Sequence, residues 1–306
     1  MNLIVCYTPL QVLIAERIID LYPNEQFYGV MIYPVANAKY QYYADRLEAK
    51  CEQFFSLHQH TDRFNLLKEI IELKYRFSRK VFQRVFVASI NDIQIQFLLS
   101  AIGFEHFYTF DDGTANIVPS SVYYKDEPNT FIRKAINRGL KNKYSVAKLK
   151  SLSEAHYTIY PDFSNIIENT INIDLFPSSA LSNDNDSISI LLGQPVYLDN
   201  EKNITLAKKV IERFNIQYYL PHPREQYQLN QVEYIHTPLI LEDYLAQVVK
   251  NKKCKIYTYF SSAVLNIYHN KNIEVIGLRI DTNEPAFIES YALLEKVGIN
   301  IIDIRE

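Results

Sequence analysis

The sequence is poor in residues that several common types of site require: its 306 residues include no tryptophan, seven glycines and three cysteines. So few glycines leave no Gly-rich loop of the kind that cradles a diphosphate. Cys6, Cys51 and Cys254 lie far apart, form no CxxC pair and match no metal-ligand spacing. We therefore expect reduced thiols and a cytoplasmic location. The net charge of −3 gives no global reason to expect a nucleic-acid partner.

Long apolar runs are also missing. The first 22 residues are largely apolar, but Thr8 and Pro9 interrupt them early, and Glu16 and Arg17 follow. This stretch has neither a basic segment at its start nor a small-residue cleavage site. It therefore predicts neither a signal peptide nor a membrane span.

The sequence instead alternates short apolar strands with amphipathic helices. In the first half, strands are expected at residues 2–6, 26–32, 84–88 and 106–110, and helices at 10–22, 36–50, 64–76 and 90–102. In the second half, strands are expected at 187–192, 216–220, 254–258 and 273–276, with helices at 203–214, from 241 and from 261. This alternation predicts an α/β protein with parallel sheets covered on both faces.

The chain length favours two domains of roughly 150 residues. We place the boundaries at residues 1–160 and 187–306, with a linker at 161–186 that ends in a polar run. Two α/β halves predict a cleft between them. Ligands of open α/β sheets bind at the carboxyl ends of the strands, and each unusual motif of this sequence follows a strand.

The first motif is Asp111-Asp112-Gly113, after the strand at 106–110. Two acids followed by glycine predict a tight turn that presents carboxylates and backbone N–H groups together. Adjacent side chains on an extended backbone point in different directions, so this is no metal-binding DxD motif. A plain turn is the alternative interpretation.

A second motif, at residues 193–199, begins with Gly193 and Gln194 and ends with Asp199. Glycine permits close approach of the backbone to a ligand. Asp199 is expected either to lie over the cleft or to cap the helix that follows.

A third motif holds His222 between Pro221 and Pro223 at the end of an apolar strand. Proline fixes its own φ and restricts the residue before it. The segment is therefore stiff and extended, which suits an imidazole that must be aimed. The alternative is a rigid turn with a merely exposed ring.

The fourth motif runs from Tyr259 to Ser261 and Ser262. Serines at the start of a helix are either simple caps or, with free N–H groups and the positive end of the dipole, a phosphate seat. Glu242, at the start of another helix, is either an ordinary first-turn acid or a partner for a ribose diol.

Together, Tyr-Thr-Pro-Leu-Gln at 7–11, the acid-acid-Gly turn at 111–113, His-Pro at 222–223 and Ser-Ser at 261–262 resemble the motifs of bacterial sialyltransferases. The order and spacing are most similar to glycosyltransferase family 52, over nearly the whole chain. The resemblance implies a GT-B fold of two Rossmann-like domains, the donor CMP-sialic acid and a terminal galactose of a bacterial surface glycan, lipooligosaccharide or capsule, as acceptor. It further implies inversion in one displacement, with no metal or other cofactor.

The resemblance also implies roles for single residues. His222 is the expected general acid for departure of CMP, and the expected general base is Asp199, with Asp112 as the second candidate. Residues 1–160 would form the acceptor side and 187–306 the donor side. The remaining donor-binding candidates are Thr8, Gly113, Gly193, Gln194, Pro223, Glu242, Tyr259, Ser261 and Ser262.

Family members also include membrane-associated dimers, which implies a homodimer and peripheral contact with inner-membrane lipid. Residues 131–151 contain seven Lys or Arg and no acid. They are either a solvated helical face or a patch for anionic headgroups or a charged glycan.

Other functions remain open from the sequence. These are a polysialyltransferase, a transferase of another CMP-linked keto-sugar, a GT-B epimerase or hydrolase of a UDP-sugar, and a non-catalytic glycan-binding protein. The α2,3 or α2,6 linkage is also left open.

Overall fold

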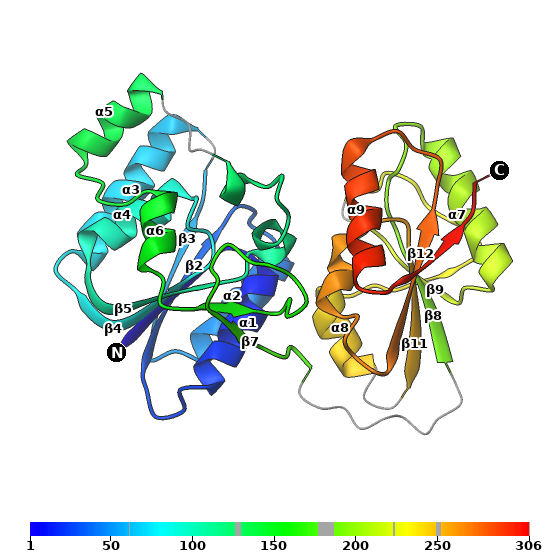
Figure 1. The fold of residues 1–306 in the computed structure, drawn as a ribbon, viewed down its shortest axis with the longest axis horizontal. Coiled ribbons are helices and arrows are strands. Elements are labelled where there is room, and N and C mark those ends of the chain that lie inside the picture. The colour runs from blue at the N-terminus through cyan, green and yellow to red at the C-terminus, as the bar shows by residue number, and fades with distance from the viewer. Residues whose placement is uncertain (61, 126–129, 177–186, 223, 249–251, 306) are drawn as a thin grey trace. The chain divides into compact units, whose positions relative to one another are not determined.

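A computed structural model describes residues 1–60, 62–125, 130–176, 187–222, 224–248 and 252–305 (Figure 1). The chain divides into two compact units, Met1–Leu175 and Phe176–Glu306. Both units have the α/β organisation that the sequence predicts.

The first unit contains a seven-stranded sheet in which every strand pair is parallel. Across the sheet the strands are β3 (Gln53–His58), β2 (Phe27–Tyr33), β1 (Asn2–Cys6), β4 (Val81–Val87), β5 (Gly103–Phe110), β6 (His156–Thr158) and β7 (Thr170–Asn172). Its α-helices are α1 (Pro9–Asp20), α2 (Ala38–Ala49), α3 (Arg63–Phe77), α4 (Ile93–Ala101), α5 (Phe131–Gly139) and α6 (Val146–Leu152). Two 3₁₀ helices, η1 (Gly113–Asn116) and η2 (Val122–Tyr124), follow β5.

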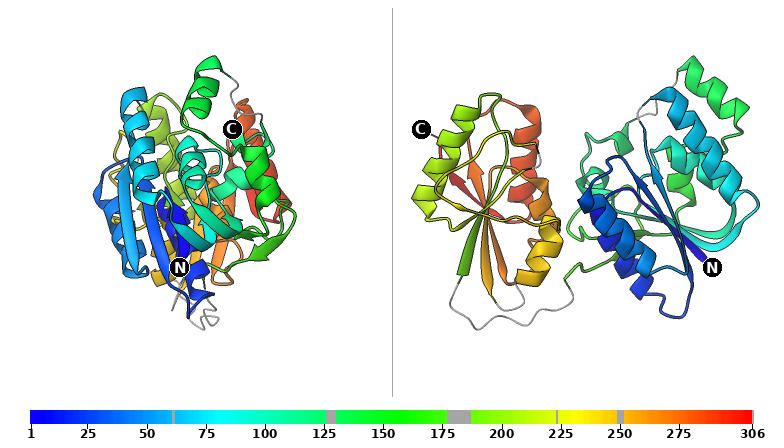
Figure 2. Two further views of the ribbon diagram at one scale, coloured as in Figure 1. Left: turned by 90° about the vertical axis from the view of Figure 1, so that its left-hand side faces the viewer. Right: turned by 180° about the vertical axis from the view of Figure 1, so that it is seen from behind.

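The central strand β1 is apolar after Asn2 because helices cover both faces of this sheet. All five residues of β1 are buried. On one face, Leu3 and Val5 join a core with residues of α3, α4 and α6. The helices α1 and α2 cover the other face, as Figures 1 and 2 show. There the ring of Phe86 stacks on that of Tyr108, with centroids 5.2 Å apart.

The second unit contains a six-stranded sheet, again wholly parallel. Its order is β10 (Glu233–Tyr234), β9 (Tyr218–Leu220), β8 (Ser187–Leu192), β11 (Lys253–Thr258), β12 (Ile273–Arg279) and β13 (Asn300–Asp303). The helices are α7 (Asn200–Phe214), α8 (Leu241–Val248), η3 (Ser262–Asn266) and α9 (Pro285–Lys296). α7 packs on one face of the sheet, and α8 and α9 lie on the other (Figure 1).

All eight strands expected from the sequence are present, whereas five short or peripheral ones were not predicted. The missed strands are β3, β6, β7, β10 and β13. β7 has three residues, all exposed, so no apolar pattern marks it, and it lies inside the segment predicted as a linker. The helix expected from residue 261 is the five-residue 3₁₀ helix η3. Within the described residues, no helix is both long enough and apolar enough to cross a bilayer.

The buried aromatic cluster on β4 gives a stability prediction. Phe86 is fully buried between rings of Tyr22, Tyr108 and Tyr157. Phe86→Ala removes these contacts and leaves a cavity, so we expect a loss of about 3–5 kcal/mol in the free energy of unfolding. Val81→Ala, at a 72% exposed site on the same strand, serves as the control. Equal losses for the two variants in urea unfolding would contradict this packing.

Candidate functional site

Parallel pairing places the carboxyl ends of β1, β4 and β5 at one edge of the first sheet, and Asp112 lies there directly after β5. Gln11, in the first turn of α1, donates through Nε2 to Asp112 Oδ1. Ser89, after β4, donates to Oδ2 over 3.2 Å, and the hydroxyl of Tyr123 donates to Oδ2 over 2.7 Å. Donors from three segments therefore hold this half-buried carboxylate in a fixed orientation.

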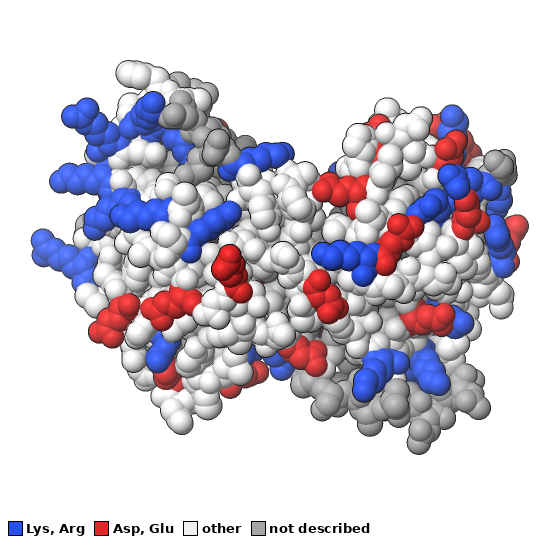
Figure 3. Space-filling model, viewed as in Figure 1, with Lys and Arg blue, Asp and Glu red and all other residues white. Residues whose placement is uncertain are grey.

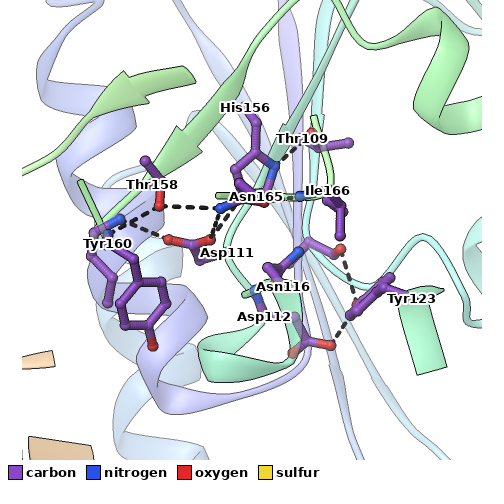
Figure 4. Close-up of polar contacts among 12 residues, drawn as sticks. Thr109, Asp111, Asp112, Asn116, Tyr123, His156, Thr158, Tyr160, Asn165 and Ile166 are labelled. Carbon is purple, nitrogen blue, oxygen red and sulfur yellow. Dashed lines mark hydrogen bonds and ion pairs between the residues drawn. The ribbon is translucent and has the colours of Figure 1, made fainter. Parts of the chain in front are cut away.

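The side chain of Asp111 points away from that of Asp112 (Figure 4), and it is fully buried. His156 Nε2 lies 2.8 Å from Asp111 Oδ1, and Asn165 Nδ2 donates to the same oxygen over 3.1 Å. The backbone N–H of Ile159 donates to Oδ2 over 2.7 Å. The two adjacent acids therefore differ in role: Asp111 ties β5 to the segment around β6, and Asp112 is the one available at the sheet edge.

Gly113 and Thr8 shape the backbone around Asp112. Gly113 has φ +65°, a left-handed conformation that a side chain disfavours. Thr8 caps α1, its hydroxyl accepting the N–H of Gln11 over 3.3 Å. Both candidates therefore have structural reasons to be present.

Gln11 is the residue of this edge that the sequence prediction missed. Its Oε1 accepts the N–H of Tyr7 over 2.6 Å, while Nε2 reaches Ser89 as well as Asp112. The sequence signal was the Thr-x-x-Gln spacing at the start of α1, which is that of a capping box.

In the second unit, His222 follows β9 and is half-buried. The backbone N–H of Arg224 donates to His222 Nδ1 over 3.1 Å. A neutral ring that accepts at Nδ1 carries its proton on Nε2, so Nε2–H is the donor presented by this turn. Burial, and secondarily the positive charge of Arg224, lower the pKa of His222 below its usual value, so the neutral form predominates at pH 7.

Gly193 and Gln194 lie beside this turn, after β8. A Cβ on Gly193 would meet Glu225 Oε1 at 2.0 Å and the hydroxyl of Tyr219 at 2.6 Å. No other residue fits there without displacing Glu225. Gln194 Oε1 accepts from the hydroxyl of Thr258 and the N–H of Phe260, each over 3.1 Å, which anchors the amide across the ends of β8 and β11.

Asp199 is exposed and caps α7, accepting the N–H of Glu201 through Oδ1 over 2.9 Å. The capping interpretation of this residue is therefore correct. Its other oxygen accepts no hydrogen bond from the residues that the structure describes, so capping leaves one oxygen open to a ligand.

The candidates after β11 and on α8 differ in exposure. Ser261 and Ser262 begin η3, with Ser262 exposed and Ser261 half-buried. Because η3 is a short 3₁₀ helix, any phosphate seat here depends on hydroxyls and N–H groups more than on a helix dipole. Tyr259 is only 2% exposed, and its hydroxyl is buried without a hydrogen-bond partner among the described residues. Glu242 is buried and accepts from Asn266 Nδ2.

Two further predictions, a role for Pro223 and independence from metal, are not tested by the structure. Pro223 lies outside the described residues. Among the residues that are described, no three His, Cys, Asp or Glu side chains gather closely enough to hold a metal ion, and metal independence stays a prediction.

Comparison with solved structures identifies the fold class. The whole chain superposes on 85% of a crystal structure of Arabidopsis thaliana UGT89C1 complexed with UDP-L-rhamnose, with a TM-score of 0.55 and 12% identity. A crystal structure of the glycotransferase of kitacinnamycin gives a TM-score of 0.53, at 11% identity, over 99% of this chain and 86% of that one. Both share the arrangement of two parallel α/β sheets, and the fold is that of the GT-B glycosyltransferases.

Sequence comparison then gives the family. Residues 24–282 match glycosyltransferase family 52, and the chain belongs to that family. It is 56% identical, over the full length of both chains, to a CMP-N-acetylneuraminate:beta-galactoside alpha-2,3-sialyltransferase of Pasteurella multocida. It is 39% identical, over 98% of this chain and 99% of the relative, to an N-acetyllactosaminide alpha-2,3-sialyltransferase of Haemophilus influenzae.

The division of roles between the adjacent acids gives a second prediction. Asp111→Asn places an amide among three donors in a fully buried site, so we expect a loss of about 3 kcal/mol in unfolding free energy. Asp112→Asn, at the half-buried edge, should cost about 1 kcal/mol. Thermal and urea unfolding of the two variants measure these losses. Equal losses, or a larger loss for Asp112→Asn, would show that the acids are assigned the wrong way round.

Proposed function

We propose that this protein is an inverting, metal-independent α-2,3-sialyltransferase that moves sialic acid from CMP-sialic acid to a terminal galactose of a bacterial surface glycan. The observation that carries the proposal is the full-length match, at 56% identity, to a protein named for that activity. The same match favours the α-2,3 linkage over α-2,6. It also favours a galactoside acceptor over the polysialyl and UDP-sugar alternatives.

On the leaving-group side, His222 acts by donating Nε2–H to the phosphate of CMP. As the bond from C2 of sialic acid to the phosphate oxygen breaks, negative charge grows on that phosphate, and a fixed donor stabilises it. The hydrogen bond from Arg224 to Nδ1 keeps the donor on the correct nitrogen. Removing one such preorganised donor costs roughly 10²–10³-fold in rate.

On the attacking side, a carboxylate takes the proton of the galactose hydroxyl while that oxygen bonds to C2. We assign this role to Asp199, because one of its oxygens caps α7 and the other accepts no hydrogen bond from the described part of the chain. Asp112, whose two oxygens accept from three side chains, is the second candidate and is better suited to orienting an acceptor hydroxyl. One displacement on the β-linked donor gives an α-linked product.

The remaining donor contacts are assigned to the carboxyl ends of β8 and β11. Ser261 and Ser262 supply hydroxyls for the phosphate, and Gln194 supplies amide N–H groups. The buried hydroxyl of Tyr259 lacks a hydrogen-bond partner among the residues with described positions. It suits a bond to the donor, because a buried polar group without a partner costs about 1–3 kcal/mol. Glu242 is assigned to the ribose.

Release of CMP from CMP-N-acetylneuraminic acid tests these assignments, with and without lactose. We expect release that requires lactose, survives EDTA, and falls about 10²–10³-fold in His222→Ala and about 10²–10⁴-fold in Asp199→Ala. Glu212→Ala, at an exposed site of α7, is the control. If Asp112→Asn were inactive while Asp199→Ala kept activity, the base would be Asp112. Release that is independent of every galactoside would overturn the transfer reaction.

We also propose a homodimer that makes peripheral contact with anionic lipid on the cytoplasmic face of the inner membrane. Phe64, Ile71 and Tyr75 lie on one side of α3, 68%, 52% and 87% exposed. Figure 3 shows basic side chains gathered on the part of the first unit where α5 lies, and Lys74 of α3 bonds to the carbonyl of Leu140 after α5. An apolar stripe beside basic charge suits binding at a lipid headgroup layer.

The lipid proposal predicts a loss of vesicle binding on changing this stripe. Ile71→Ser/Tyr75→Ser should lower co-sedimentation with vesicles containing anionic phospholipid at least several-fold, because the apolar contact area is removed. Glu72→Gln, at an exposed site of the same helix, should not lower it. If the double variant bound vesicles normally but its dimer dissociated in light scattering, α3 would be a subunit interface instead.

A further inference from the structure

The turn that carries His222 contains a carboxylate with no role so far, Glu225. Its side chain folds back over the turn, and Oε1 accepts the backbone N–H of His222 over 3.1 Å. The backbone N–H of Glu225 in turn donates to the carbonyl of His222 over 2.9 Å. Residue 222 is therefore clamped through both of its main-chain polar groups by one residue.

Two neighbours fix the position of this carboxylate. The hydroxyl of Tyr219, on β9, donates to Oε1 over 2.7 Å. On the other side, Gly193 at the end of β8 provides the space, since a Cβ there would lie 2.0 Å from Oε1. Two strands of the sheet thus determine where Glu225 sits, and Glu225 determines where the backbone of His222 sits.

The clamp also controls which ring nitrogen of His222 carries the proton. The backbone N–H of Arg224 reaches Nδ1 only while the turn between residues 222 and 225 stays closed. If the turn opens, Nδ1 loses that donor, and the neutral ring is free to adopt either tautomer. Only the tautomer with Nε2–H can donate outward from Nε2.

We propose that Glu225 is a positioning residue that holds His222 in the Nε2–H tautomer and in the orientation needed to donate to the leaving phosphate. Donation from His222 to the leaving phosphate rests on the proposed function, whereas the effect of Glu225 on the tautomer of His222 does not. Glu225 acts as an acceptor, and its charge is secondary, so the amide of glutamine can replace it. Burial raises the pKa of Glu225 above its usual value, and the hydrogen bonds that it accepts from Tyr219 and from the backbone of His222 oppose this rise.

The test compares Glu225→Ala with Glu225→Gln. In Glu225→Ala we expect kcat to fall about 100-fold, because a small misplacement of a catalytic group lowers the rate by about that factor. KM for CMP-sialic acid should change less than about threefold. In Glu225→Gln we expect kcat within about fivefold of the original, because its carbonyl still accepts from His222 and Tyr219. Glu212→Gln is the isosteric control on an exposed helix site.

A second readout needs no turnover. ¹⁵N NMR of histidine-labelled protein reports the tautomer of each ring, and His222→Gln identifies the signal of His222 by its loss. We expect the Nε2–H tautomer in the original protein and in Glu225→Gln, and a mixture in Glu225→Ala. Should Glu225→Ala fail to fold, Tyr219→Phe, which removes one bond to Oε1, should give a smaller shift in the same direction.

The outcomes separate the two levels of the proposal. A tautomer change in Glu225→Ala without CMP release from any form of the protein would support the positioning role and overturn the sialyltransferase assignment. Normal kcat and an unchanged tautomer in Glu225→Ala would overturn the positioning role alone. A glutamine variant as inactive as the alanine variant would also overturn it, because the charge rather than the acceptor would then be essential.

Discussion

The candidate site of this protein depends on one constraint, which is that every paired strand of each sheet is parallel. Parallel strands all end at the same edge of a sheet, so segments far apart in the sequence meet there. In the first unit this brings Gln11 and Ser89 to Asp112. In the second it brings Gly193, after β8, beside Glu225, after β9. The chemistry is carried by these short turns, and the sheets determine where the turns lie.

The two adjacent acids show how a turn can serve the fold and the site together. An extended backbone sends neighbouring side chains in opposite directions. The side chain of Asp111 consequently lies in the interior, where His156, Asn165 and the backbone of Ile159 form hydrogen bonds with its carboxylate. The side chain of Asp112 remains at the carboxyl ends of the strands. The buried Asp111 holds the turn in place, and the turn in this way fixes the position of Asp112. A single carboxylate could not do both, because full burial would remove it from any substrate.

The sequence predicted the α/β class, eight of the thirteen strands that the structure describes and the position of each motif after a strand, because hydrophobic periodicity and turn residues are local signals. It did not predict that Gln11 is a partner of Asp112, or that Gly193 is required by Glu225, because these contacts join residues 101 and 32 positions apart. The short strands β7 and β10 were missed for a related reason. Strands of two or three residues carry no pattern, and only pairing with a neighbouring strand defines them.

The most direct test of the account is the structure of the product made from CMP-N-acetylneuraminic acid and lactose. NMR of the reaction mixture distinguishes both the anomer and the linkage of the sialic acid. We expect the first product formed, in the presence of EDTA, to be α-2,3-linked sialyllactose, with one CMP released for each molecule. A β-linked product, an α-2,6 linkage or free sialic acid alone would contradict it.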